Sequence, residues 1–217
     1  MAEWHPAFEE YCETIFELAE DDITVVQARI AERLHVSRPS VSEMIKRLDR
    51  GGLVATTEHV IRLTPEGRRL AESVVRRHRL AERLLTDVLG MSWAFAHREA
   101  GKWEHVISVE VEEAITRLLG DPTTCPHGNP IPGSGYSAPD AHPLADVGVG
   151  DGFQVTRIPE ELEFTPGLLD FLEDSHLTPG VVGRVTASSP DGTLTVEVDG
   201  RAVDGDPFAS QRILVTI

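Results

Sequence analysis

Three helical stripes in the first fifty residues constrain the fold of this chain more than any other feature. Apolar side chains recur at helical spacing through residues 7–20, and a second stripe begins at Thr24, where Gln27 three positions later completes a capping-box pattern. A third helix is expected after Ser37, a residue type that caps helices, with Pro39 in its first turn. Only a short turn separates the second helix from the third, which is typical of a helix-turn-helix.

A small hairpin is expected directly after these helices. The pair Gly51-Gly52 ends the third helix, and residues 53–57 and 60–63 then form two short strand-like runs around a two-residue turn. The order of helix, helix, turn, helix and hairpin predicts a winged helix-turn-helix.

The remaining chain divides into a helical part and a β-rich part. Thr64 and Pro65 begin a long helix that is expected to reach about residue 89, and two further helices follow before Gly120. Six prolines then mark a linker, and short apolar runs beyond residue 147 predict several strands and a small barrel. The fold class is therefore mainly α with a small β domain. The expected domains are a winged helix-turn-helix over 1–64, a helical domain over 65–120, the linker over 121–145 and the β domain over 146–217.

The formal net charge of −16 argues against nucleic acid as a partner, but the charges are unevenly distributed. Of the 20 Lys and Arg residues, 13 lie before residue 84, whereas from Asp140 onward there are four basic residues and 14 acidic ones. Local charge decides contact with DNA, so the concentration of basic residues in the first part of the chain keeps a DNA-binding function open.

Nothing in the sequence predicts a membrane or secreted protein. No apolar run approaches the ~20 residues of a membrane-spanning helix, and the N-terminal residues are polar and acidic, unlike a signal peptide. Cys12 and Cys125 are far apart, and neither belongs to a CxxC pair. We therefore expect a reduced, cytoplasmic protein that does not bind membranes.

The third helix and its flanks carry residue types that read DNA. The first residues of a recognition helix contact base edges in the major groove, while cations near them hold phosphates. Pro39 and Ser40 offer little hydrogen bonding to bases, so sequence reading is expected to depend on van der Waals contact and DNA shape. The alternative is a three-helix core with a merely solvated outer face. The expected DNA-binding residues are Gln27, Arg29, Ser37, Arg38, Pro39, Ser40, Ser42, Glu43, Lys46, Arg47 and Arg50.

A set of His and Glu residues on the following helices has the spacing of metal ligands. His78 and Glu82 are four positions apart and project from one helical face. His97 begins a second stripe that includes Glu104 and His105. Imidazole and carboxylate together suit divalent first-row metals. The alternative is that His78, which lies in an apolar row, is a buried core histidine.

Four stretches carry a resemblance to a known family: QARIAERLHVSRPSVSEMIKRLDRGGLV, RHRLAERLLTDVLG, HREAGKWEHVISVEVEEAI and CPHGNPIPG. They resemble the diphtheria toxin repressor family of iron- and manganese-dependent regulators, strongly through residue 133. The acidic C-terminal part is more weakly similar to the family's SH3-like (FeoA-like) barrel. The resemblance implies a homodimer that binds Fe²⁺ or Mn²⁺, then binds double-stranded operator DNA and represses metal-uptake genes.

The resemblance also implies two metal ions per chain. The ligands that it assigns to the primary site are Glu10, Gly101, Glu104 and His105. The ancillary site takes two ligands from the segment PEELEF, where the second is Glu in place of the family's Gln. The ligands that it assigns to the ancillary site are His78, Glu82, His97, Glu160 and Glu163.

Two positions of the primary site depart from the iron-type members, which usually carry Met and Cys there. Glu10 stands at the first, and Gly101 at the second offers only a backbone carbonyl or leaves a position for water. Glu13, one turn after Glu10, matches a carboxylate of the manganese branch. Oxygen ligands with one imidazole favour Mn²⁺, with Fe²⁺ as the alternative, while Zn²⁺, Co²⁺ or Ni²⁺ also bind tightly in vitro. Cys125 and His127 are interpreted as part of a structured turn.

Two other function classes stay open. Neighbouring metal sites with carboxylates could activate water in a hydrolase, but the chain shows no nucleophile motif or Gly-rich phosphate loop. A winged-helix regulator that senses a small organic ligand, with structural His and Glu residues, is the second alternative. The favoured interpretation is a Mn²⁺-responsive repressor that is not an enzyme and has no small-molecule substrate.

Overall fold

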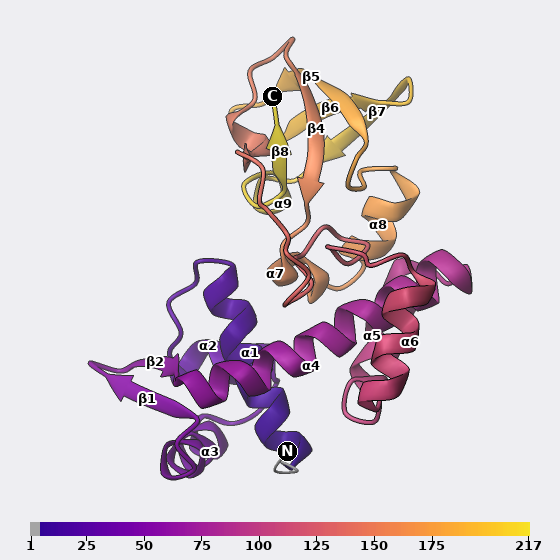
Figure 1. Ribbon diagram of the computed structural model, residues 1–217. Coiled ribbons are helices and arrows are strands. Elements are labelled where there is room, and N and C mark those ends of the chain that lie inside the picture. Colours follow the sequence, from indigo (N-terminus) through magenta and orange to yellow (C-terminus); the bar gives the residue numbers. More distant parts are fainter. Residues whose placement is uncertain (1–4) are drawn as a thin grey trace.

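The computed structural model describes residues 5–217, and residues 1–4 of the first expected domain lie outside the described residues (Figure 1). The N-terminal part consists of helices followed by an antiparallel hairpin, over a core that includes Cys12, Ile30 and Leu48. These elements are α1 (Pro6–Glu20), α2 (Gln27–Arg33), α3 (Arg38–Arg50), β1 (Val54–Thr57) and β2 (Val60–Leu63). Their order is the one that the sequence predicts for a winged helix-turn-helix.

Side-chain caps determine where α3 and α4 (Pro65–Arg83) begin. Ser37 Oγ accepts a hydrogen bond from Ser40 N at 3.3 Å, and Thr64 Oγ1 accepts one from Gly67 N at 3.1 Å. Each hydroxyl satisfies a backbone N–H that the helix itself cannot pair. The two N-caps predicted from the sequence are confirmed.

The capping box predicted at Thr24 is wrong, because α2 begins at Gln27 without a side-chain cap. The backbone before α2 is extended and makes a different contact. Ile61 N of β2 donates a hydrogen bond to Val25 O at 2.9 Å, and both side chains are buried. Tertiary pairing with the hairpin thus overrides the local helix signal.

The long helix α4 crosses the middle of the molecule (Figure 1). It packs against α1 on one side and against α5 (Trp93–Trp103) on the other. A π-helical turn (Leu84–Val88) extends α4, and α6 (Val109–Leu118) follows α5. The buried face of α4 therefore meets both the N-terminal part and the second helical part. None of the described helices is long and apolar enough to cross a membrane.

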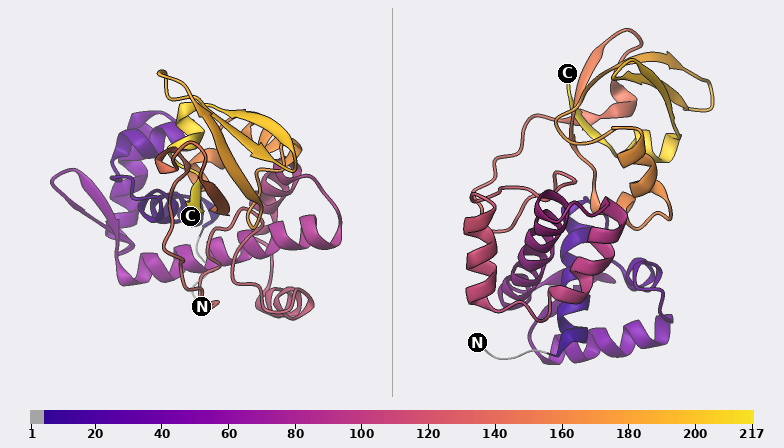
Figure 2. Two further views of the ribbon diagram at one scale, coloured as in Figure 1. Left: turned by 90° about the horizontal axis from the view of Figure 1, so that it is seen from above. Right: turned by 90° about the vertical axis from the view of Figure 1, so that its right-hand side faces the viewer.

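The C-terminal part is an antiparallel sheet, which Figure 2 shows from two further sides. Its strand order is β3-β8-β4-β5-β6-β7, and it has its own apolar core. The strands are β3 (His142–Pro143), β4 (Gly152–Arg157), β5 (Val182–Ser188), β6 (Leu194–Val198), β7 (Arg201–Gly205) and β8 (Leu214–Thr216), and the helices are a 3₁₀ turn (Leu144–Asp146), α7 (Glu160–Glu163), α8 (Leu168–Asp174) and α9 (Pro207–Ser210). The fold class, mainly α with a small β domain, is confirmed. In the described pairings β3 and β7 remain edges, so the sheet is not closed into a hydrogen-bonded barrel.

The first half of the expected linker, 121–133, is packed against the rest of the molecule. Its backbone closes on itself where Cys125 N donates to Asn129 O at 2.9 Å. It also joins the sheet, because Ile158 N donates to His127 O at 2.8 Å. Gly128 allows this approach: its φ is +88°, and an added Cβ would overlap the carbonyl oxygen of β4 beneath it. The turn is thereby fixed between the helical part and the sheet.

Candidate metal centres and DNA-binding face

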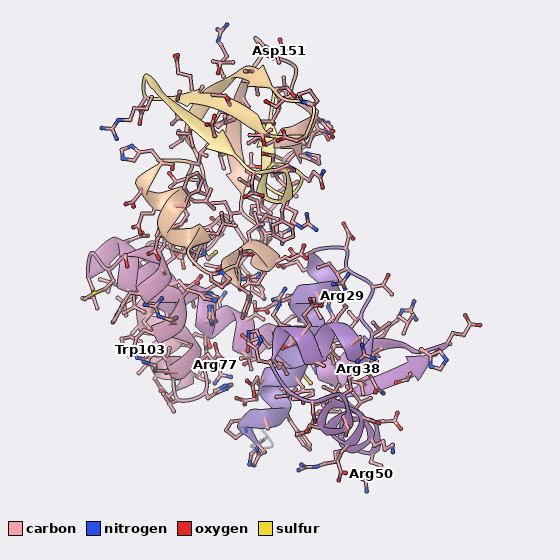
Figure 3. All side chains as sticks on the ribbon, turned by 180° about the vertical axis from the view of Figure 1, so that it is seen from behind. Arg29, Arg38, Arg50, Arg77, Trp103 and Asp151 are labelled. Atoms are coloured by element: carbon pink, nitrogen blue, oxygen red, sulfur yellow. The ribbon has the colours of Figure 1, made fainter. Side chains whose placement is uncertain are left out.

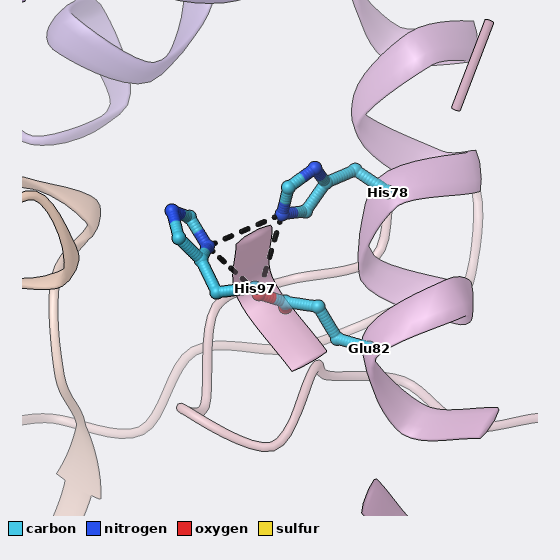
Figure 4. Close-up of side chains that lie close together, drawn as sticks. All are labelled: His78, Glu82 and His97. Carbon is cyan, nitrogen blue, oxygen red and sulfur yellow. Dashed lines mark hydrogen bonds and ion pairs between the residues drawn. The ribbon is translucent and has the colours of Figure 1, made fainter. Parts of the chain in front are cut away.

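Two helices bring three expected ligands into direct contact. His78 and Glu82 of α4 point toward His97 of α5 (Figure 4). His78 Nε2 lies 3.2 Å from Glu82 Oε1 and 3.3 Å from His97 Nδ1. His97 Nδ1 in turn lies 3.0 Å from Glu82 Oε1. Since His78 and Glu82 are one turn apart, the helix itself places them on the same face.

Helix α7 adds carboxylates from the C-terminal part. Glu163 Oε2 lies 3.1 Å from His97 Nδ1 and 2.9 Å from His127 Nδ1. Glu160 also has an oxygen within 4.8 Å of the ligand atoms of His97 and Glu163. Its Oε2, however, lies 3.2 Å from Arg79 Nη2. Glu163 is therefore directed at the imidazoles, whereas Glu160 is shared with a buried arginine.

Two buried residues that the sequence analysis left outside the metal sites also reach this group. His127 Nδ1 lies 3.8 Å from Cys125 Sγ and 3.6 Å from Glu82 Oε1. Glu82, Cys125 and His127 each offer a ligand atom within 4.8 Å of the others. In the sequence, the Cys-x-His pair was the signal that could have indicated these two ligands. Nothing in the spacing of the pair, however, relates this turn to α4. We call the whole group the ancillary cluster: His78, Glu82, His97, Cys125, His127, Glu160 and Glu163.

A second group forms where α1 approaches the end of α5. His78 Nδ1 lies 2.6 Å from Glu104 Oε2, and Glu104 Oε1 lies 3.2 Å from His105 Nε2. Glu13 of α1 is buried beside them, with a carboxylate oxygen within 4.8 Å of the ligand atoms of His78 and Glu104. Residues from two domains thus meet at one point.

Glu10 and Gly101 line the same cavity of about 600 Å³ as this second group. Glu10 is exposed, and its neighbour Glu9 makes the contact with His105, 2.7 Å from Glu9 Oε2 to His105 Nδ1. Apart from its chain neighbours and the backbone of its own helix, no described residue lies within 4 Å of the place where a Cβ of Gly101 would be. The cavity is therefore open at this position. We call the group the primary cluster: Glu10, Glu13, Gly101, Glu104 and His105.

His78 stands between the two clusters. Its Nδ1 faces Glu104 of the primary cluster, and its Nε2 faces Glu82 and His97 of the ancillary cluster. A metal-ligating histidine usually donates its other ring N–H to a carboxylate, which fixes the ring orientation. With Nε2 directed to the ancillary cluster, Nδ1–H donates to Glu104. The same carboxylate therefore orients a ligand of one cluster and belongs to the other.

Charges within the ancillary cluster shift the pKa values of its members strongly. Burial alone would raise the pKa of Glu82, but His127 and His78 outweigh it and hold this pKa well below its usual value. Burial alone would lower the pKa of His97, but the carboxylates of Glu163 and Glu82 raise it to about 10. Protonated imidazoles thus balance the carboxylates in the ion-free protein.

The primary cluster has an excess of carboxylates. Burial raises the pKa of Glu13 well above its usual value, and the nearby Glu104 and Glu17 raise it further. Glu13 Oε1 is buried without a hydrogen-bond partner among the described residues. A buried carboxylate with an unused oxygen fits a cation, and the set of oxygens and imidazole nitrogens is one that divalent first-row ions accept.

The expected DNA-binding residues lie on α2 and α3, away from the sheet, as the labelled Arg38 and Arg50 show (Figure 3). Val41, Ile45 and Leu48 bury the opposite face of α3 in the core. Gln27 and Ser42 are half-buried. The remaining expected residues are exposed, namely Arg29, Ser37, Arg38, Pro39, Ser40, Glu43, Lys46, Arg47 and Arg50.

Removing two cations from α3 should weaken binding to DNA of any sequence. We expect Lys46→Ala combined with Arg47→Ala to make the negative slope of log K, the DNA association constant, against log salt concentration less steep by about 2. The reason is that two phosphate contacts are lost. Fluorescence anisotropy over a salt series measures the slope. The control is Arg184→Ala with Arg201→Ala, two exposed cations of the sheet. An unchanged slope in the α3 variant would place the DNA-binding face elsewhere.

Comparison with known proteins identifies the family. Residues 5–60 match the family described as "Iron dependent repressor, N-terminal DNA binding domain", and residues 64–133 match "Iron dependent repressor, metal binding and dimerisation domain". The iron-dependent repressor IdeR of Mycobacterium tuberculosis is 40% identical over 206 residues, which cover 88% of each chain. This chain belongs to the diphtheria toxin repressor family. The diphtheria toxin repressor of Corynebacterium diphtheriae is 46% identical over 144 residues, 66% of this chain and 59% of that one.

Solved structures extend the similarity to the C-terminal part. A manganese-dependent transcriptional repressor in complex with manganese has a TM-score of 0.85 at 33% identity, covering 96% of this chain and 98% of that one. The manganese regulator SloR has a TM-score of 0.76 at 31% identity, covering 98% and 99%. The sheet, which the sequence indicates only weakly, therefore belongs to the fold that this chain shares with these two regulators.

Members of the diphtheria toxin repressor family are metal-dependent transcriptional repressors, so the chain is not an enzyme and the hydrolase alternative is excluded. A DNA-binding domain and a dimerisation domain imply operator DNA and a second copy of the chain as partners. The dimerisation domain exposes apolar side chains on α5, α6 and the segments beside them: Val88, Leu89, Met91, Phe95, Val106, Val109, Val111 and Leu118.

Proposed function

We propose that this chain is a Mn²⁺-responsive repressor that binds operator DNA as a dimer and controls genes of metal uptake. The observation that carries the proposal is the composition of the primary cluster. Glu10, Glu13 and Glu104 supply oxygen, His105 supplies an imidazole, and Gly101 has no side chain. No sulfur donor is among the described residues that line this cavity. Such a donor set suits Mn²⁺ better than softer ions.

Each cluster would hold one ion. In the primary cluster the ligands would be the three carboxylates and His105, and Gly101 could offer only its backbone carbonyl. In the ancillary cluster Glu82, His97 and Glu163 form the centre, and the proposal adds Cys125 and His127 to the ligands expected from the sequence. A bound divalent ion supplies the positive charge that lets neighbouring buried carboxylates stay ionised together.

The primary cluster would act as a switch because it joins two domains. Glu10 and Glu13 belong to α1 of the DNA-binding domain, whereas Glu104 and His105 follow α5 of the dimerisation domain. Shared ligation by both sides fixes the angle between the domains, and hence the separation of the two α3 helices in a dimer. Only a difference in metal affinity between the two arrangements can shift DNA binding, and a coupling of about 1–3 kcal/mol suffices.

Fe²⁺ is the second candidate ion. The relatives at 40% identity are named iron-dependent. The thiol of Cys125 at the ancillary cluster is also a ligand that Fe²⁺ accepts more readily than Mn²⁺ does. Burial raises the pKa of this thiol well above its usual value, and Glu82 and Glu163 raise it further, so the thiol is protonated in the ion-free protein.

The decisive experiment is fluorescence anisotropy of the protein on its own promoter DNA. We would compare chelator, Mn²⁺, anaerobic Fe²⁺ and Zn²⁺, each buffered at a free concentration expected in cells. Tight binding with Mn²⁺ and not with Fe²⁺ supports the proposal, and the reverse supports the iron alternative. Equal binding with chelator present contradicts a metal switch and favours a regulator of organic ligands.

Binding of Mn²⁺ should release protons at neutral pH. His97, with its pKa of about 10, holds a proton at pH 7 in the ion-free protein, and the raised pKa of Glu13 favours its protonated form. Ligation requires their deprotonated forms, so the apparent Mn²⁺ affinity should increase between about pH 6 and about pH 8. Calorimetry in buffers of different ionisation enthalpy measures the release, which we expect to be about one proton or more per ion. Heats that do not depend on the buffer would contradict this expectation.

A further inference from the structure

Phe164 lies between a candidate metal ligand and the helix-turn-helix. It is the residue directly after α7, which lies between the sheet and the helices (Figure 1). Its ring meets the His97 ring edge-on, with 5.3 Å between centroids and an interplanar angle of 89°. The guanidinium carbon of Arg33 lies 4.2 Å from the centroid of the same ring. One side chain of the C-terminal part thus touches both the ancillary cluster and α2.

Arg33 is held firmly on its own side of this contact. It belongs to the last turn of α2, the first helix of the helix-turn-helix. Its side chain is 6% exposed and lies 3.4 Å from Glu17 Oε2 of α1. Leu34 and His35, in the turn that leads to α3, line the same cavity as Phe164. Phe164 therefore lies beside the turn that joins the two helices of the helix-turn-helix.

The core of the C-terminal part does not by itself fix Phe164, because the side chain is 44% exposed. The same part is anchored at the C-terminal end of α1, where Arg157 Nη2 lies 2.6 Å from Asp21 Oδ1 and Glu161 N donates to Asp21 Oδ2 at 2.9 Å. These contacts attach α7 to α1. They leave the contact of Phe164 with Arg33 as a separate point of contact with α2.

We propose that Phe164 is a positioning residue that couples the filling of the ancillary cluster to the orientation of the helix-turn-helix. The inference rests on the metal-responsive function proposed above. Glu163 and Phe164 are adjacent, and Glu163 Oε2 lies 3.1 Å from His97 Nδ1. When Glu163 and His97 share a ligated ion, the residue before Phe164 and the imidazole that contacts its ring are both fixed. The ring then holds Arg33, and with it α2, in one position.

The expected effect follows from the size of such contacts. A cation–π pair corresponds to a change of about 2- to 30-fold in an equilibrium constant and a typical allosteric coupling to about 5- to 150-fold, so the two ranges overlap at about 5- to 30-fold. Phe164→Ala should therefore weaken Mn²⁺-stimulated binding to promoter DNA by about 5- to 30-fold. Its Mn²⁺ affinity should stay within about threefold of the unaltered protein, because Phe164 has no ligand atom. Anisotropy measures the first quantity and calorimetry the second.

Matched variants make the test specific. Phe171→Ala removes a similarly exposed Phe of α8 that lies outside the cavity lined by Phe164, and it should behave as the unaltered protein. Arg33→Lys keeps a charge for Glu17 but loses the planar group that stacks on the ring, so it should share the defect of Phe164→Ala.

Three outcomes would overturn the proposal, and they can be told apart. Normal DNA binding by Phe164→Ala in a protein that responds to Mn²⁺ removes the coupling role and leaves the proposed function intact. Loss of Mn²⁺ binding in Phe164→Ala would mean that the ring supports the metal centre itself. Absence of any metal response in the unaltered protein would overturn the proposed function together with this inference.

Discussion

Replacing Glu104 with glutamine should reduce Mn²⁺-stimulated DNA binding by at least about 100-fold. Glu104 is buried, and its oxygens lie 2.6 Å from His78 Nδ1 and 3.2 Å from His105 Nε2. The change removes a proposed primary ligand and also the charged acceptor that orients His78. Loss of such an outer partner alone costs about 10- to 100-fold in metal affinity, and loss of a direct ligand costs more. Anisotropy at a buffered Mn²⁺ concentration that just saturates the unaltered protein measures the effect.

The control for this variant is Glu197→Gln, an exposed carboxylate of β6. Both variants lose one negative charge, so a general electrostatic effect would appear in both. Circular dichroism should show an unchanged helix content, because glutamine keeps the shape of the buried side chain. If Mn²⁺ stimulated DNA binding by the Glu104→Gln protein as it does for the unaltered protein, Glu104 would not be a ligand of the proposed site.

Arg79→Ala should lower the free energy of unfolding by about 3–5 kcal/mol, the range for breaking one side of a buried ion pair. Arg79 is 1% exposed, and its Nη2 lies 2.6 Å from Glu20 Oε2 and 3.2 Å from Glu160 Oε2. It also donates a hydrogen bond to the carbonyl oxygen of Pro130. Alanine would leave Glu160 and the carbonyl group of Pro130 without this partner, and Glu20 with Arg157 alone, at the junction of α1, α7 and the packed turn. Chemical denaturation followed by circular dichroism measures the loss.

Arg69→Ala is the matched control on the same helix. Arg69 pairs with Glu66 on the surface, where both side chains are about half exposed or more. Exposed pairs contribute about 0–1 kcal/mol, so this variant should unfold almost as the unaltered protein does. If Arg79→Ala were equally mild, the junction would be held by packing rather than by its charges.

Local signals in the sequence predicted those features that local physics determines. Ser37 and Thr64 were predictable as caps because a hydroxyl before a helix satisfies a free N–H whatever the tertiary structure. His78 and Glu82 were predictable as a pair because the helix period places them on one face. The capping box predicted at Thr24 was wrong because the next residue, Val25, forms a backbone hydrogen bond with β2. No local rule predicts that contact.

Features that depend on distant contacts escaped prediction. The turn with Cys125 and His127 reaches Glu82 only because it packs between α4 and the sheet. Strand β7 was not predicted, since Arg201–Gly205 is mostly exposed and has no apolar alternation. Glu9 rather than Glu10 contacts His105, a difference of one residue that only the rotation of α1 against α5 decides. Each of these depends on how two elements meet, and spacing within one element carries no such information.

The separation of α3 from the acidic sheet gives the molecule an uneven charge distribution. Helix α3 and the sheet lie at opposite ends of the molecule (Figure 1), and the residues from Asp140 onward carry 14 acidic and four basic side chains. In the field of DNA this uneven distribution turns α3, which carries four basic and two acidic side chains, toward the phosphates. The rate of association is then governed by the charge near α3 and not by the total of −16. An overall acidic protein can thereby approach an acidic polymer in a productive orientation.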